Sequence, residues 1–179
     1  MTISFKKYFL VPVAILTFAI FAAPQAQAME GSWFGVGSSY ESISSGFTQG
    51  GFSVDMEGGY WYLGNLAYGG YVKGNFFGAA NHNAGSDLKI IDLGGFWKAG
   101  TDEGLYGKVL LGVAFVNLTG SVPSFREGGG NSLYLGLGGG YSFPISERLQ
   151  IGPEVLYRHL TAGNGGDQIS IGALVTHSF

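Results

Sequence analysis

The sequence predicts an all-β domain, an eight-stranded, antiparallel, up-and-down transmembrane β-barrel. Three observations indicate this fold class. Apolar and polar residues alternate with a period of two in eight segments, long and short connections alternate between them, and glycine and aromatic residues are abundant while charge is scarce. The 179 residues include 33 glycines, 15% aromatic and 12% charged residues, against about 7% Gly and about 25% charged residues in ordinary domains.

The eight alternating segments are typical of strands that separate two different environments. The last one is the plainest, because Ile169, Ile171 and Val175 share one face while small or polar residues occupy most of the other. In chain order, the predicted strands cover 33–40, 52–62, 68–77, 90–98, 106–115, 132–143, 149–158 and 169–179.

The connections indicate a meander whose two ends face different compartments. The predicted long connections are 41–51, 79–87, 119–130 and 161–167, and the short ones are 64–66, 100–104 and 144–148. Tilted strands of about 9–11 residues suffice to cross a membrane. Eight of them with these connections fill the domain and leave no room for a second one.

Residues 1–28 have the pattern of a cleavable secretory signal peptide. Two lysines precede an apolar run over 8–23, and a small-x-small cleavage sequence ends at Ala28. A membrane anchor is disfavoured, because the run is short and contains Pro12. We therefore expect export by a Sec-type signal and a mature barrel domain over 29–179.

Composition and charge exclude several classes of protein. Glycine has no Gly-X-Y period, which excludes collagen, and the aromatic content excludes a disordered linker. The formal net charge of -3 provides no basic surface, so we expect no nucleic-acid partner. The chain has no cysteine and therefore no disulfide or thiolate metal site, and we expect neither a metal nor a cofactor.

The position of the charges distinguishes a membrane barrel from a soluble one. A soluble barrel is apolar inside, but here the charged face is also the face with most of the glycines, which relieve crowding inside a narrow barrel. We therefore place the charged face in the lumen and the Leu/Val/Tyr/Phe face against lipid. The predicted lumen charges are Asp55, Glu57, Lys73, Asp92, Lys98, Lys108, Glu154 and Arg158.

Aromatic residues of the lipid face gather at two levels, as the two interfaces of a bilayer select. With the first strand starting in the periplasm, the periplasmic rim holds Phe34, Tyr60, Tyr62, Tyr68, Trp97, Tyr141, Phe143 and Phe179. The opposite rim holds Tyr40, Phe52, Phe76, Phe115 and Tyr157.

With these features the chain resembles the small eight-stranded outer-membrane barrels of Gram-negative cell envelopes, which include the membrane domain of OmpA and the opacity-type surface proteins. The most specific shared feature is the last strand, which ends at Phe179 with apolar residues at alternate positions back to Ile169. His177 departs from the aromatic residue usual at its position. The resemblance implies an outer-membrane location, contact with outer-membrane lipid and lipopolysaccharide, and recognition of Phe179 by the barrel-assembly machinery. We expect a monomer.

The predicted lumen set contains four acids and four bases, and charges in a narrow interior must be paired. The set therefore indicates a structural plug of salt bridges. The alternative is a narrow, porin-like diffusion pore in which the pairs exchange partners. Eight strands enclose space for side chains and little else, which favours the plug. A surface-interaction role would use the loops, where Phe47, Phe125 and Arg126 are the bulky candidates.

An enzymatic alternative rests on His159 and Thr161, which share one face near the outer end of the seventh strand. Their spacing is similar to the His-x-Ser of the outer-membrane lipid A deacylases. Threonine replaces serine, and the last strand offers no lipid-facing carboxylate to orient the histidine, because Asp167 lies in a predicted loop. We therefore expect a structural or surface-interaction protein that is not an enzyme and has no catalytic residues.

Overall fold

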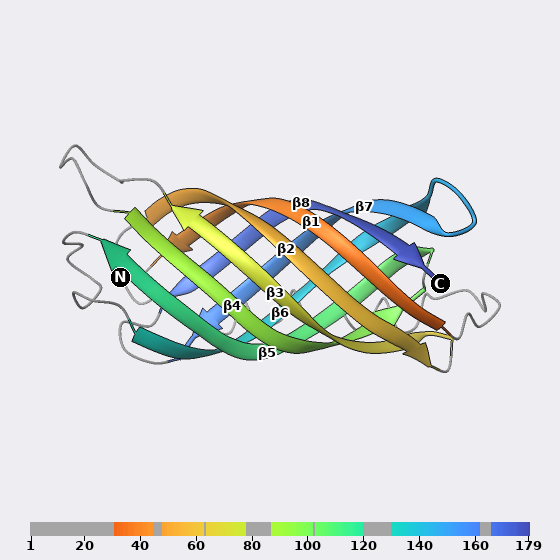
Figure 1. Ribbon diagram of the computed structural model, residues 1–179, viewed down its shortest axis with the longest axis horizontal. Helices are drawn as coiled ribbons and strands as arrows, with labels where there is room; N and C mark the ends of the chain where they lie inside the picture. Colours follow the sequence, from red (N-terminus) through yellow and green to blue (C-terminus); the bar gives the residue numbers. More distant parts are fainter. Residues whose placement is uncertain are drawn as a thin grey trace, which may run out of the picture.

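The computed structural model describes residues 31–44, 48–62, 64–77, 87–101, 103–119, 130–161 and 166–179. They form one closed barrel in which every strand pairs antiparallel with its sequence neighbours and the first pairs with the last (Figure 1). The strands are β1 (Gly31–Ser44), β2 (Thr48–Tyr62), β3 (Leu66–Phe77), β4 (Asp87–Gly100), β5 (Gly104–Thr119), β6 (Gly130–Pro144), β7 (Leu149–Leu160) and β8 (Asp167–Ser178). The predicted eight-stranded, up-and-down, all-β fold is confirmed.

Two predictions concern residues that the structure does not describe. The signal-peptide prediction for 1–28 lies outside the described residues, as do the loop candidates Phe47, Phe125 and Arg126. Within the described ranges, no helix is long and apolar enough to cross a membrane.

The strands are longer than the sequence predicted, at 12 to 16 residues each. The largest error is the predicted connection 41–51. Strand β1 runs to Ser44 and β2 starts at Thr48, so the regular alternation of long and short connections fails there. Its serines and glycines suggest a loop by composition, but the inward alternation continues through Glu41 and Ile43, whose exposure is 0%.

The two faces of the wall differ as predicted. Outward-facing Leu, Val, Ile and aromatic side chains are exposed, and the rim residues Tyr40, Trp97 and Phe179 have exposed fractions of 63%, 58% and 76%. The inward face holds seven of the eight predicted lumen charges as buried side chains, and Asp55 as a half-buried one. Apolar residues thus cover the outside of the barrel while charges lie inside it, the reverse of a soluble protein.

The two ends of the barrel are called the terminal end and the loop end. The terminal end is where β1 begins and β8 ends, beside the C-terminus in Figure 1. The loop end is the opposite one, where β1 leads into β2 and β7 leads into β8. Tightly packed inward glycines let side chains from several strands fill the space between the two ends.

Two adjacent glycines of β3 give a matched test of this packing. A Cβ at inward Gly69 would lie 2.1 Å from the Gly58 carbonyl oxygen and 2.6 Å from Cζ of Phe96, whereas at outward Gly70 the nearest atom is 3.5 Å away. We expect Gly69→Ala to destabilise the barrel by about 1–3 kcal/mol, because the wall and Phe96 must shift. Gly70→Ala should change stability by less than about 1 kcal/mol. Urea unfolding followed by tryptophan fluorescence measures both, and equal effects would contradict this packing.

Candidate functional site

The loop-side network is a set of four buried charges from four strands: Glu41 of β1, Lys73 of β3, Asp92 of β4 and Arg158 of β7. Lys73 Nζ lies 2.8 Å from Glu41 Oε1, and Arg158 Nη2 lies 3.3 Å from Glu41 Oε2. Arg158 also pairs through Nη1 with Asp92 Oδ2. All four residues are at most 2% exposed, so the pairs are shielded from solvent.

Neutral polar side chains add further hydrogen bonds to this network, although Arg158 Nε has no hydrogen-bond partner among the described residues. Gln168 Nε2 donates to Glu41 Oε2 at 3.0 Å and to Asn75 Oδ1 at 3.1 Å. Asn75 Nδ2 in turn donates to Asp92 Oδ2 at 2.8 Å. The hydroxyls of Ser53 and Ser170 donate to Glu41 at 2.7 Å and 2.6 Å. Hydrogen bonds of this kind help to offset the cost of burying an ionic cluster.

Glu41 has the most partners in this network, and the sequence analysis missed it. The error follows directly from placing 41–51 in a loop, since the inward alternation of β1 reaches Glu41 only if the strand is extended. Asn75, Gln168 and Ser170 were also missed, because an uncharged polar residue on the inner face gives no signal beyond its alternate position.

The terminal-side network consists of Glu57, Lys98, Lys108 and Glu154. Lys108 Nζ pairs with Glu57 Oε2 and lies 3.1 Å from Glu154 Oε2. The Lys98 ammonium lies over three aromatic rings, 3.7 Å from the Tyr106 centroid and 5.2 Å and 5.4 Å from those of Trp33 and Trp61. These cation–π contacts and the nearby carboxylates of the same network hold a lysine that is only 3% exposed.

Apolar side chains close the lumen beyond both networks. At the terminal end the buried set comprises Trp33, Trp61, Ala67 and Phe96. At the loop end it comprises Ile43, Phe77, Leu88, Ile90 and Leu160. The charged networks, these apolar caps and the apolar side chains between the two ends, such as Tyr71 and Leu110, make the interior a packed core, as expected for eight strands.

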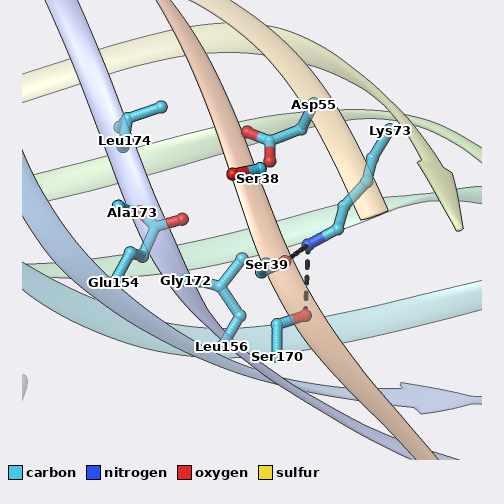
Figure 2. A pocket seen from close by; sticks show the side chains of 10 residues that line it. All are labelled: Ser38, Ser39, Asp55, Lys73, Glu154, Leu156, Ser170, Gly172, Ala173 and Leu174. Carbon is cyan, nitrogen blue, oxygen red and sulfur yellow. Dashed lines mark hydrogen bonds between the residues drawn. The ribbon is translucent and has the colours of Figure 1, made fainter. Parts of the chain in front are cut away.

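The predicted charge Asp55 lies on β2 between the two networks, and no ion pair joins it to another described residue. It lines a small cavity together with Lys73 and Glu154 (Figure 2). The structure therefore brings seven of the eight predicted charges into two networks and leaves Asp55 beside a cavity.

The enzymatic candidates lie on the outside of the barrel at the loop end, and one prediction about them is wrong. Asp167 is the first residue of β8, and its Oδ1 lies 2.8 Å from Nδ1 of His159. An orienting carboxylate is therefore present, because β8 starts two residues earlier than predicted. The Tyr157 hydroxyl donates to the same oxygen at 2.7 Å. The Thr161 hydroxyl, however, donates to the Leu133 carbonyl oxygen at 3.0 Å, which engages the hydrogen that a nucleophile would have to give up.

The described part of the chain has no obvious metal-binding site. No group of three or more His, Asp and Glu side chains could hold a metal ion there. Inside the barrel, charged side chains form ion pairs across the lumen. Outside it, Asp167 orients the His159 ring.

Comparison with solved structures identifies the same fold in several bacterial proteins. Neisserial surface protein A has a TM-score of 0.58 at 15% identity, covering 83% of this chain and 97% of that one. Ail, the attachment invasion locus protein of Yersinia pestis, has a TM-score of 0.56 at 15% identity, with coverages of 83% and 99%. The N-terminal β-barrel domain of Pseudomonas aeruginosa OprF has a TM-score of 0.52 at 14% identity, with coverages of 83% and 99%.

Neither a family model nor a curated protein sequence matches the chain. The fold is that of the small eight-stranded outer-membrane barrels, as the resemblance implied. At these identities the likeness concerns the fold alone.

The loop-side network can be tested at Arg158. Arg158→Ala leaves the buried carboxylates of Glu41 and Asp92 without their shared cation, so we expect the barrel to lose about 3–5 kcal/mol of stability. The matched control is Arg148→Ala, which removes an exposed arginine from the turn between β6 and β7 and should be nearly neutral. Urea unfolding in lipid vesicles measures both variants. An Arg158→Ala barrel that unfolds at the urea concentration of the parent would show that the network contributes nothing.

Proposed function

We propose that the protein is a monomeric, integral outer-membrane barrel with a closed lumen, which serves a structural or surface-interaction role. The single observation that carries this proposal is the filled interior, with two ion-pair networks between apolar caps. A packed interior supports neither a permanent pore nor an internal active site. The function is therefore carried by the outer wall and the loops.

The outer wall supports the membrane part of this proposal. Side chains such as Val36, Leu111 and Ile171 are 45%, 53% and 59% exposed, and apolar residues of this kind surround the barrel. A water-soluble monomer rarely exposes so large an apolar surface. A closed barrel also satisfies its backbone hydrogen bonds internally, which the hydrocarbon core of a bilayer requires.

The rims support contact with outer-membrane lipid and lipopolysaccharide. Aromatic pairs lie at both levels. The rings of Phe52 and Phe76 are stacked with their centroids 5.1 Å apart, and those of Tyr141 and Phe143 are tilted with their centroids 4.5 Å apart. Amphipathic rings at two levels match the two interfaces of a bilayer. The exposed Phe179 ring is available to the barrel-assembly machinery during biogenesis.

Conductance measurements can test the alternative function, a narrow diffusion pore. We expect protein purified from outer membranes to give no reproducible single-channel steps in a planar bilayer, because ion pairs and apolar side chains fill the interior of the described part of the barrel. A heat-dependent gel shift on the same sample confirms that the barrel is folded. Discrete steps of reproducible size would contradict the closed lumen and favour the pore.

The lipid A deacylase-like alternative is favoured by the oriented His159 and opposed by the engaged Thr161 hydroxyl. We expect expression of the protein to leave the acylation of lipid A unchanged in mass spectra. The matched comparison is a His159→Gln variant expressed to the same level. Loss of an acyl chain with the parent but not with this variant would establish an enzyme.

A further inference from the structure

One lysine of the strands takes no part in the lumen. Lys89 of β4 lies between Leu88 and Ile90, which face inward and are 1% and 0% exposed, so its own exposed side chain faces outward. The other lysines and the arginine of the described strands all belong to the two networks. Within the described strands, Lys89 is therefore the one lysine or arginine that the outer wall presents to the membrane.

Lys89 lies in the aromatic rim at the loop end. It is paired in register with Phe76 of β3 and with Asn117 of β5. The Phe76 ring stacks on that of Phe52, and both rings are exposed. Aromatic rims mark the level at which the acyl chains of a bilayer give way to its headgroups. A lysine at this depth can lay its apolar stem along the wall and place its ammonium among the headgroups.

Two asparagines add polar groups to the same face of the wall. Asn117 is exposed beside Lys89, and the exposed Asn131 of β6 is paired in register with Phe115 of β5. No ion pair or hydrogen bond joins the side chains of Lys89, Asn117 and Asn131 to another described residue. We call these three residues the rim patch. Its ammonium and its two amides offer one positive charge and several hydrogen-bond donors to a ligand outside the barrel.

The connections beside the rim patch indicate which leaflet it faces. At the loop end, β3 and β4 are joined by 78–86, and β5 and β6 by 120–129. At the terminal end the connections are shorter, as between Gly100 and Gly104 (Figure 1). Outer-membrane barrels have their longer connections outside the cell and their short turns in the periplasm. In an outer membrane, the rim patch thus lies at the level of the outer leaflet, whose lipopolysaccharide carries phosphate groups on its sugars.

We propose that the rim patch binds a phosphate group of lipopolysaccharide, with the Lys89 ammonium against the phosphate oxygens and the two amides donating to the phosphate or its sugar. The positive charge selects an anion, and the exposed rings of Phe76 and Phe115 suit the apolar part of the same lipid. On the opposite side of the barrel, Asp167 of β8 pairs with His159 and offers no net positive charge. The lipid therefore binds at β4, β5 and β6. This inference rests on the outer-membrane location in the proposed function and deepens its lipid contact.

Titration of the detergent-solubilised barrel with purified lipid A, followed by native mass spectrometry, tests this site. The protein is purified from cell envelopes and washed free of lipid, and lipid A is added in phosphorylated and dephosphorylated forms with the same acyl chains. We expect the wild type to prefer the phosphorylated form. Lys89→Gln should weaken binding of that form about fivefold, the contribution of one lysine near a membrane surface, and leave binding of the other form unchanged. Lys89→Arg should keep the preference, because it keeps the charge.

The matched control is Arg148→Gln, which removes an exposed basic residue from the turn between β6 and β7 and should bind both forms as the wild type does. Equal affinities of the wild type for the two forms would overturn the proposal, and so would a preference that survives in Lys89→Gln. A heat-dependent gel shift confirms that each variant is folded. Fractionation of cell envelopes tests the outer-membrane location separately. Wild-type protein found outside the outer membrane would contradict the proposed function without changing these affinities.

Discussion

Pairing of buried charges across a narrow lumen is the constraint on which the rest of this structure depends. An arginine that is 1% exposed is tolerable only with carboxylates and polar donors arranged around it. Arg158 meets Glu41 and Asp92 because β7 faces β1 and β4 across the interior. The ion pairs therefore join strands that share no hydrogen-bond ladder, and they fix the cross-section of the barrel.

The apolar parts of the molecule are arranged around that ionic centre. Large rings and aliphatic side chains close the two ends of the lumen, while another apolar set covers the outside. The Lys98 ammonium shows how the two kinds of packing combine. The rings of Trp33 and Trp61, which belong to the apolar cap at the terminal end, and the buried ring of Tyr106 together stabilise a cation. The lumen is thus a core in the ordinary sense, although buried polar and apolar residues contribute to it in about equal numbers.

Alternation lets one strand serve two environments at neighbouring positions. On β7, Arg158 points inward to the loop-side network, while Tyr157 and His159 on either side of it contact Asp167 outside the barrel. The outer cluster holds the start of β8 against the end of β7 at the loop end. Its oriented histidine has one feature of a catalytic site, while the Thr161 hydroxyl near it donates to the Leu133 carbonyl oxygen.

The amino-acid sequence by itself determined the fold class, the number of strands and the two faces of the wall. These features are local, because a period of two along each segment separates apolar from polar side chains whatever the other strands do. Only the tertiary structure decided which charges meet. Glu41 and Arg158 are 117 residues apart and pair only through the closed register of the barrel, and His159 meets Asp167 only because β8 begins earlier than its composition suggests. Asp55 was predicted to be one of eight paired charges. The geometry of the closed wall, which turns Lys73 toward Glu41, leaves it beside a cavity instead.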